Sequence, residues 1–308
     1  MTRRAISPRF AMSNEVIGPN IQPVVRIRVG AQVSGAGGVS RAIERAVAIE
    51  AEAVQVFVDP NRRYPRAPLP LDELTRLRGG LRRAQLPGYV HVPYLANVAT
   101  TDPALLPRSV EMVSRALTAA DAARLRGVVV HPGSHLGRGF EAALDDTCAA
   151  LAAAWRAAAV DVPLLLENTA GAGGHIGSAV AELRAILDGL DREGVRAGLC
   201  IDLQHAHAAG WDLSRARGVE AFAHDLRSHG LARRVGLVHA NDSRSATGSR
   251  LDRHANPGEG TIGARGFRLI AQVRELARVP WILEVPGEDH SGPRRTDVRR
   301  LRRIVSAA

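Results

Sequence analysis

The sequence predicts a single (β/α)8 barrel, a TIM barrel, with a functional site at the carboxyl ends of its strands. Eight short apolar runs rich in β-branched residues alternate with eight segments of helical periodicity over about 285 residues. Nine His, Asp and Glu residues stand where these runs end or in the loops that follow them. Because parallel strands present their carboxyl ends at one mouth of a barrel, we expect these nine side chains to converge there.

The predicted strands are runs in which apolar residues follow one another with little polar interruption. Such runs are typical of strands that are buried on both faces, as in a parallel sheet. They cover residues 24–29, 53–58, 88–92, 127–131, 163–167, 197–202, 235–240 and 281–285.

The predicted helices lie between these strands, at residues 40–51, 71–84, 104–126, 140–158, 178–192, 218–228, 264–277 and 295–305. Pro70 and Asp72 suit the start of the second helix, and Ser178 with Glu182 gives the fifth a polar first turn. The connections after residues 91 and 131 and over 240–263 are longer than usual. Long loops at this end of a barrel often bind a ligand.

The composition indicates one domain without a membrane segment. The chain has 308 residues and is 45% hydrophobic, so we expect one barrel over residues 24–308 and a polar, irregular extension at 1–23. No apolar stretch approaches the roughly 20 residues of a membrane helix, and the start lacks the apolar centre of a secretory signal. We therefore expect a cytoplasmic protein. Cys148 and Cys200 are too few for a disulfide framework and are predicted to be buried packing residues.

The net charge is +10, and every basic side chain is arginine because the sequence contains no lysine. This charge favours polyanionic partners, and the guanidinium group suits phosphate recognition. A GC-rich genome that exchanges Lys for Arg throughout is an alternative explanation of the arginine content. The absence of lysine excludes aldolase or lyase chemistry through a lysine Schiff base.

Metal-type ligands end several of the predicted strands. Burying an ionised carboxylate after three apolar residues is costly unless a cation or a hydrogen-bond network compensates for it. Asp202 is followed three residues later by His205, and the i, i+2 spacing of Asp252 and His254 places both on one side of extended backbone. The nine candidate ligands are His91, His131, Glu167, Asp202, His205, His239, Asp252, His254 and Glu284.

The number and type of these ligands indicate a centre with more than one ion. Mixed imidazole and carboxylate ligands suit zinc, and manganese or iron less selectively. A catalytic zinc takes about three protein ligands, so nine ligands suit two or three ions. Several ions close together support phosphodiester hydrolysis, and the arginine-rich composition is consistent with a nucleic-acid substrate.

Five blocks of the sequence resemble the endonuclease IV family of zinc-dependent abasic-site endonucleases. The resemblance extends from about Val25 to Glu288, nearly the whole predicted barrel. The blocks are GAQVSGAGG at 30–38, HPGSH at 131–135, ENTAG at 167–171, HAHAAGWD at 205–212 and the segment 239–260. Blocks of this length, in this order, are highly specific.

The resemblance implies a trinuclear zinc centre, for which all nine family ligands are present. Glu167, Asp202 and Glu284 would be the catalytic carboxylates. The implied arrangement assigns His91, His131 and Glu167 to one ion, Glu167 with Asp202, His239 and Glu284 to a second, and His205, Asp252 and His254 to a third.

The activity that the resemblance implies is hydrolysis of the phosphodiester on the 5′ side of an abasic site in duplex DNA. The product is a 3′-hydroxyl, and blocked 3′ ends would also be trimmed. The absence of lysine agrees with hydrolysis instead of β-elimination. We expect a monomer. We expect no nucleotide cofactor, because the spacing of Gly35, Gly37 and Gly38 does not match a dinucleotide-binding fingerprint and indicates a turn.

The resemblance also implies DNA-handling residues. Arg62 resembles the family arginine that enters the duplex at the lesion, and Tyr94 resembles the tyrosine beside it, with Leu95 adjacent. An inserted side chain would help to hold an extrahelical abasic nucleotide. The alternatives are a solvated loop arginine and an aromatic ring at the barrel rim.

Several positions depart from the family pattern without removing a ligand. Gln32 stands where a histidine is usual, and Pro93 replaces a small polar residue. Leu203 and Gln204 replace a Thr-Cys type pair, and His207 replaces an aromatic residue. These departures bear on substrate fit and efficiency.

Two other functions are compatible with a metal-binding barrel. A sugar isomerase or epimerase of the xylose-isomerase-like kind would use Glu167, Asp202, His239 and Glu284 for one or two metals. It would leave His91, His205, Asp252 and His254 without a role. A non-catalytic barrel that binds DNA or stores metal is the third possibility, and turnover distinguishes it.

Overall fold

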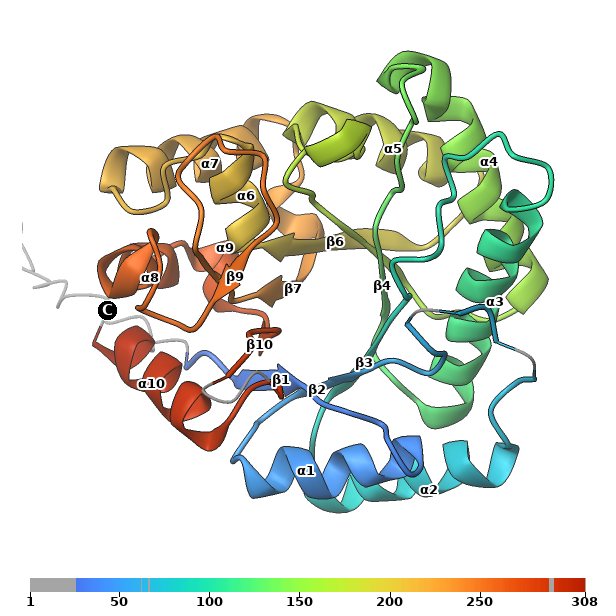
Figure 1. Cartoon of the computed structure of the whole chain (residues 1–308), viewed down its shortest axis with the longest axis horizontal. Helices are drawn as coiled ribbons and strands as arrows, with labels where there is room; N and C mark the ends of the chain where they lie inside the picture. The colour runs from blue at the N-terminus through green and yellow to red at the C-terminus, as the bar shows by residue number, and fades with distance from the viewer. Residues whose placement is uncertain (1–25, 62, 66, 288–290, 308) are drawn as a thin grey trace, which may run out of the picture.

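The computed structural model describes residues 26–61, 63–65, 67–287 and 291–307 and shows a closed barrel of eight parallel strands (Figure 1). This confirms the predicted fold. Around the barrel the strands follow the order β1-β10-β7-β6-β5-β4-β3-β2. Their bounds are β1 Val29–Gln32, β2 Val54–Val56, β3 Gly88–His91, β4 Val128–Val130, β5 Leu164–Glu167, β6 Ala197–Asp202, β7 Val235–His239 and β10 Trp281–Leu283.

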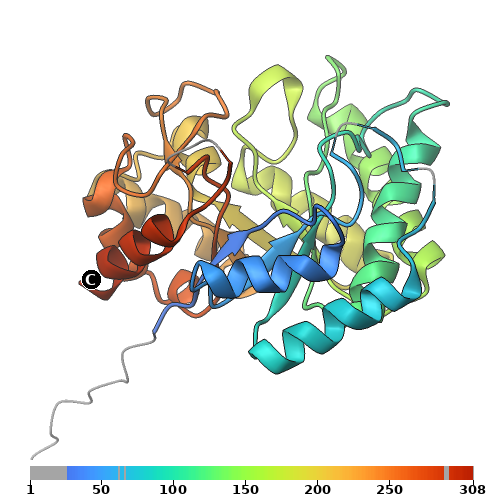
Figure 2. The same cartoon turned by 60° about the horizontal axis from the view of Figure 1, so that its bottom comes forward.

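Helices surround the barrel, and in the turned view of Figure 2 the first two run along its outside. The long helices are α1 Ala42–Ala48, α2 Leu71–Ala84, α3 Leu106–Ala123, α4 Phe140–Ala158, α5 Val180–Arg192, α7 Ala216–Ser228, α8 Gly263–Ala271 and α10 Arg295–Ser306. The polar first turn predicted near the fifth helix is present, because Glu182 Oε2 accepts from the backbone N–H groups of Gly177 and Ser178 at 2.7 and 3.1 Å. In the described part of the chain, no helix combines the length and apolar character needed to span a membrane.

Short elements that the sequence did not predict lie between the barrel strands. Helix α6 Leu203–Ala209 follows β6 directly, and the long connection after β7 contains a hairpin of β8 Asp242–Ser243 and β9 His254–Ala255. The predicted helix at 264–277 is wrong in one respect. It divides into α8 and α9 Arg274–Ala277, because Val273 between them has extended backbone angles. Single-turn 3-10 helices lie at Val39–Arg41, Ala172–Gly174 and Ala232–Arg234.

The predicted first strand was placed too early. Strand β1 shares only Val29 with the predicted range 24–29, of which residues 24 and 25 lie outside the described residues. Arg26 and Arg28 are exposed, whereas the barrel position is taken by the small residues Gly30 and Ala31, which carry little strand signal. A small residue is needed there, because a Cβ at Gly30 would lie 2.4 Å from the backbone oxygen of Ala53.

Alternate strand residues point into the barrel and form two layers. The lower layer is apolar and contains Ala53, Tyr89, Val129, Leu165, Cys200, Leu237 and Ile282. The next inward position of each strand lies two residues further on. We call these eight positions the mouth layer: Gln32, Gln55, His91, His131, Glu167, Asp202, His239 and Glu284. The two layers give the barrel an apolar floor beneath a polar mouth.

The two cysteines, Cys148 and Cys200, are buried and free, as predicted. The proposed division into an extension at 1–23 and a barrel at 24–308 stays a prediction, because residues 1–25 lie outside the described residues.

The close approach at Gly30 predicts that Gly30→Ala destabilises the protein. The added methyl group meets backbone atoms, so we expect a loss of roughly 1–3 kcal/mol in the free energy of unfolding, measured by urea denaturation. Gly79→Ala is the control. Its nearest neighbour is the flexible Arg83 side chain, so a gain of up to about 1 kcal/mol is expected from helix propensity. Equal stability of Gly30→Ala and the parent would contradict the register of β1.

Candidate metal centre

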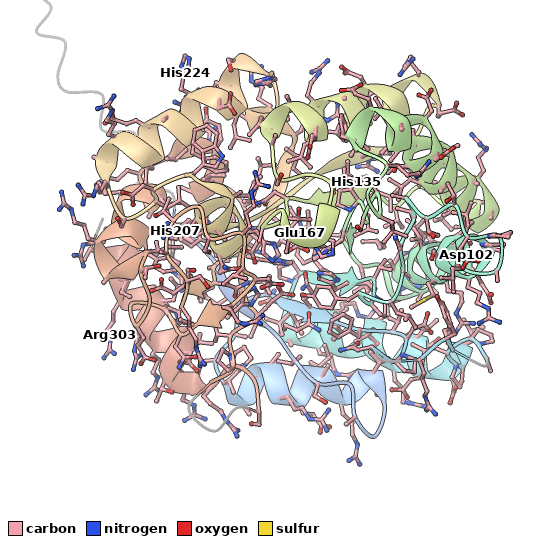
Figure 3. The ribbon with its side chains drawn as sticks, turned by 45° about the horizontal axis from the view of Figure 1, so that its top comes forward. Asp102, His135, Glu167, His207, His224 and Arg303 are labelled. Atoms are coloured by element: carbon pink, nitrogen blue, oxygen red, sulfur yellow. The ribbon has the colours of Figure 1, made fainter. Side chains whose placement is uncertain are left out.

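The nine predicted ligand residues converge at the mouth of the barrel, where Figure 3 shows Glu167 near the centre and Arg303 on the periphery. Six belong to the mouth layer, His205 comes from α6, and Asp252 and His254 come from the long connection after β7. His91, Glu167, Asp202, His205 and His239 are buried. Side chains from distant parts of the sequence therefore line one hollow.

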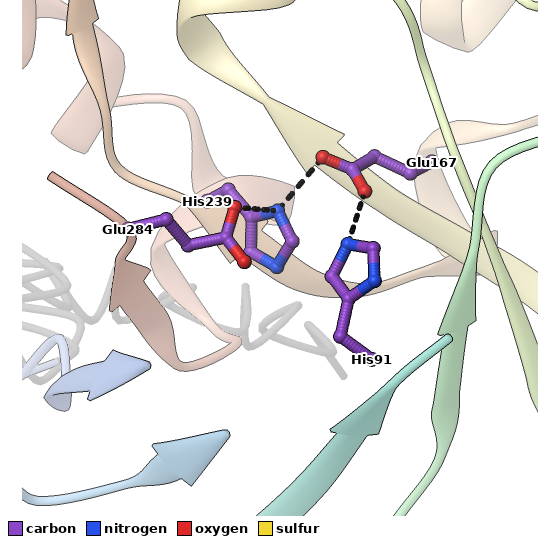
Figure 4. A group of neighbouring side chains, drawn as sticks. All are labelled: His91, Glu167, His239 and Glu284. Atoms are coloured by element: carbon purple, nitrogen blue, oxygen red, sulfur yellow. Dashed lines mark hydrogen bonds and ion pairs between the residues drawn. The ribbon is translucent and has the colours of Figure 1, made fainter. Parts of the chain in front are cut away.

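Glu167 links several of these side chains (Figure 4). Its Oε2 atom lies 2.9 Å from His91 Nε2 and 2.8 Å from His131 Nε2. Its Oε1 atom lies 2.9 Å from His239 Nδ1, and that nitrogen lies 3.1 Å from Glu284 Oε2. Both oxygens of one carboxylate thus face imidazole rings from β3, β4 and β7.

The second part of the centre combines α6 with the long connection. His205 Nε2 lies 3.4 Å from Asp252 Oδ2, and His254 Nε2 lies 3.2 Å from Asp252 Oδ1. Asp202 Oδ2 is 3.8 Å from His254 Nε2. The ligand atoms of Asp202, His205 and His254 all lie within 4.8 Å of one another, as do those of His131, Glu167 and His205.

Backbone carbonyl groups fix the orientation of three histidines. The Nδ1 atoms of His91, His205 and His254 lie 2.7, 2.8 and 3.1 Å from the carbonyl oxygens of residues 92, 168 and 284. A carbonyl oxygen only accepts, so each Nδ1 carries a proton, and a neutral ring would present the lone pair of Nε2 to the centre. Hydrogen bonds of this kind are typical of the groups that orient metal ligands.

The buried carboxylates and histidines of the centre shift one another's pKa values. Burial opposes ionisation of Glu167, but His239 and His131 hold the pKa of its carboxyl well below the usual range. Burial also opposes protonation of His205, yet Asp202 and Asp252 raise its pKa to about 10. Metal ligands must be deprotonated, so a bound divalent cation would take the place of such protons.

Three buried ligand atoms have no properly directed hydrogen bond among the described residues: His131 Nε2, His254 Nε2 and Glu284 Oε2. Charged neighbours lie within 2.8 to 3.2 Å of these atoms, so they are close to partners that they do not satisfy. Buried polar atoms in this state call for an explanation, such as an ion. Imidazole nitrogens and carboxylate oxygens are also the donor set that zinc accepts, so the residues present fit a metal centre.

An open cavity of about 1130 Å³ adjoins the centre. Its lining includes Gln32, Asn61, Arg63, Tyr94 and Glu284. The cavity gives the candidate ligands access to a molecule larger than water.

The predicted DNA-handling residues have different outcomes. The Tyr94 ring is half exposed and meets the His131 ring edge-on, with 4.8 Å between centroids, while Leu95 packs against the core. Arg62 lies outside the described residues. The part played by these three residues in DNA binding stays a prediction.

Three departures from the family pattern lie in α6, which follows Asp202. Leu203 is a core residue, whereas Gln204 Nε2 donates to the carbonyl oxygen of Leu251 at 2.9 Å. His207 Nε2 lies 3.1 Å from the hydroxyl oxygens of both Thr247 and Thr261. Gln204 and His207 therefore hold the long connection that carries Asp252 and His254.

Three residues of the centre were missed by sequence reasoning. Asn168 Oδ1 accepts from Asp202 N at 2.7 Å, and Asn241 Nδ2 donates to Asp202 Oδ2 at 2.6 Å. Both lie in the quoted motifs, Asn168 directly after Glu167 and Asn241 two residues after His239, which is a signal that could have found them. Gln55 lies inside an apolar strand, where only its place in the mouth layer could have indicated it.

Asp242 organises the long connection. Its carboxylate accepts backbone N–H groups from Gly258, Gly260 and Ile262 at 2.9, 3.0 and 3.0 Å. A Cβ at Gly260 would lie 2.3 Å from the carbonyl oxygen of Ser243, so glycine allows this close approach. The loop that supplies two candidate ligands is thus folded around one buried acid.

Comparison with known proteins first defines the class. Residues 43–304 match the family described as "Xylose isomerase-like TIM barrel". A solved structure named as a D-tagatose 3-epimerase-like protein has a TM-score of 0.67 at 19% identity and covers 91% of this chain and 96% of its own. That likeness shows the fold alone.

Closer relatives define the family within this class. "Probable endonuclease 4" of Methanoculleus marisnigri is 36% identical over 288 residues, which cover 92% of this chain and 99% of the relative. Its counterpart in Oleidesulfovibrio alaskensis is 39% identical over 265 residues, with coverage of 84% and 88%. The crystal structure of endonuclease IV from Thermus thermophilus has a TM-score of 0.79 at 31% identity and covers 91% of this chain and 100% of its own. The chain belongs to the endonuclease 4 family, which confirms the resemblance seen in the sequence.

Asp242→Ala should destabilise the long connection. Several buried backbone N–H groups would lose their acceptor, so we expect a loss of about 3 kcal/mol in the free energy of unfolding and faster proteolysis within residues 240–263. Asp161→Ala, which removes only an exposed ion pair with Arg196, is the control for both measurements. Unchanged proteolysis of the Asp242 variant would show that the loop is held by other contacts.

Proposed function

We propose that this protein is a DNA-repair endonuclease that hydrolyses the phosphodiester on the 5′ side of abasic sites in duplex DNA and trims blocked 3′ ends. The observation that carries the proposal is the convergence of all nine candidate ligands at one barrel mouth. Membership of the endonuclease 4 family supports it. The net charge of +10 suits a polyanionic substrate.

The proposed cofactor is three zinc ions. One would be held by His91, His131 and Glu167, a second by Glu167, Asp202, His239 and Glu284, and a third by His205, Asp252 and His254. The ligand distances support a bridging role for Glu167, because its two oxygens face different sets of histidines. They also place His91 close to His239 and Glu284, so the proposed sites of the first and second ions adjoin each other.

The chain's own residues would position the reacting groups. When bound, the ions supply hydroxide near neutral pH and stabilise the leaving oxygen. Asn241 Nδ2 and the backbone N–H of His205 hold Asp202 at 2.6 and 2.7 Å, which fixes this carboxylate before a substrate arrives. Tyr94 at the rim, with Leu95 and Arg62, would contact the DNA around the lesion. The cavity beside Glu284 would receive the extrahelical nucleotide.

The sugar isomerase alternative uses too few of these residues. A centre made from Glu167, Asp202, His239 and Glu284 gives no reason for the remaining ligands to meet at the same mouth. Yet His205 and His254 both approach Asp252 within 3.4 Å. This second cluster favours the hydrolase.

Zinc-loaded protein should nick a duplex that contains one abasic analogue, and pretreatment with EDTA should reduce nicking. Glu167→Ala and Asp252→Ala should each lower the nicking rate by more than about 100-fold, because each removes a metal-type ligand. Asp161→Ala, an exposed acid outside the centre, should nick like the parent.

Elemental analysis of the same preparations checks the metal count, which should be about three zinc atoms per chain in the parent. An intact abasic duplex, together with conversion of a ketose or an aldose, would favour the isomerase instead.

Arg62→Ala should weaken binding to abasic duplex DNA roughly tenfold, equivalent to about 1.4 kcal/mol, while zinc content stays unchanged. This prediction is motivated by its position in the sequence between Asn61 and Arg63, which both line the cavity. Arg303→Ala on the periphery controls for the loss of one positive charge. Equal affinities of the Arg62 variant and the parent would assign Arg62 to the solvated surface.

A further inference from the structure

Gln55 is a fully buried polar side chain in the middle of β2, and it contacts two candidate metal ligands. Its Nε2 donates to Glu284 Oε1 at 2.6 Å, and its Oε1 lies 3.0 Å from His239 Nε2. Figure 4 shows the His239 and Glu284 side chains facing each other. Gln55 belongs to the mouth layer, in which β3 to β7 and β10 supply the six ligands.

His239 is oriented differently from three other histidines of the centre. His91, His205 and His254 each donate Nδ1–H to a backbone carbonyl and face the centre with Nε2. His239 faces Glu167 and Glu284 with Nδ1 and turns Nε2 towards Gln55. Of these four histidines, His239 alone has its outer nitrogen bonded to a side chain, which a substitution can remove.

The hydrogen bonds of Gln55 follow from one another. An ionised carboxylate only accepts, so the amide NH2 group must face Glu284. The amide oxygen then faces His239, so the His239 nitrogen next to it must carry a proton. A neutral His239 ring would then carry its lone pair on Nδ1, which lies 2.9 Å from Glu167 Oε1 and 3.1 Å from Glu284 Oε2. A neutral amide can serve both partners, whereas a charged side chain could serve only one.

We propose that Gln55 is a positioning residue of the metal centre, which sets the proton of His239 on Nε2 and the orientation of Glu284. The proposal deepens the proposed function and rests on its metal centre. Groups that orient ligands in this way typically change metal affinity by 10- to 100-fold when they are removed. Gln55 would thus act on the metal through both ligands without touching it.

Gln32 offers a matched control. It pairs in register with Gln55 on the neighbouring strand β1 and also belongs to the mouth layer. Its Oε1 atom is buried without a hydrogen-bond partner among the described residues. Methionine is similar in size to glutamine, so either replacement removes only an amide group from the mouth layer. Only the change at position 55 removes hydrogen bonds to ligands.

The first experiment measures zinc affinity by chelator competition on the full chain. Gln55→Met should lower the affinity for the zinc assigned to His239 and Glu284 by about 10- to 100-fold, whereas Gln32→Met should leave the affinity for every zinc within about twofold of the parent. Circular dichroism and thermal unfolding in EDTA check that the variants fold. Parent-like zinc affinity of Gln55→Met would overturn the proposal, and so would an equal loss in both variants.

The second experiment uses NMR of zinc-loaded protein with ¹⁵N-labelled histidine to identify the protonated ring nitrogens. The parent should show His239 protonated at Nε2, and Gln55→Met should lose or broaden this signal. Gln55→Glu keeps an acceptor for His239 but repels Glu284, so the signal should persist while zinc affinity falls. A parent in which His239 is protonated at Nδ1 would overturn the proposal.

The two proposals can fail separately. If the parent binds zinc and shows these effects but does not nick abasic DNA, the proposed function fails and the role of Gln55 stands. If the parent nicks DNA and Gln55→Met retains its zinc affinity, the reverse holds.

Discussion

The centre depends on one buried carboxylate. Glu167 stands at the end of β5 with both oxygens within 2.9 Å of imidazole nitrogens from β3, β4 and β7. An ionised group here is costly to bury and needs compensating positive charge. Either protons on the histidines or cations between the ligands can supply this positive charge. Protons would occupy the ring lone pairs, whereas cations would be bound by them. The arrangement of the barrel mouth follows from this requirement.

The second constraint is the folding of the long connection after β7. Strand ends alone supply six mouth-layer ligands, but Asp252 and His254 must be brought over the mouth by a loop. The Asp242 carboxylate accepts hydrogen bonds from backbone N–H groups of this connection. Gln204 and His207 of α6 are hydrogen-bonded to other residues of the same connection. Two departures from the family pattern thus lie in the loop's support, where a changed side chain can still make a hydrogen bond without altering a ligand.

The sequence predicted the barrel and the gathering of the ligands because both follow from simple patterns. An apolar run that ends in His, Asp or Glu marks both a buried strand and its carboxyl end. The first strand was misplaced because Gly30 and Ala31 suit the barrel by being small, and small residues give little strand signal. Helix α6 was missed since it begins within the Asp202 motif, where the Asp202 carboxylate caps it by accepting from His205 N. Gln55 was missed because its role depends on pairing across the barrel.

That pairing explains why a strand without a ligand still matters to the centre. In the barrel order β2-β1-β10-β7, the strands that carry Gln55 and Glu284 are separated by β1, so the amide must reach across a neighbour. In β1, a side chain at Gly30 would meet the backbone oxygen of Ala53, the residue before β2. The small residue that obscured the first strand in the sequence thus lies directly below the layer in which Gln55 reaches Glu284 and His239. The packing of the apolar lower layer and the geometry of the mouth layer therefore depend on each other.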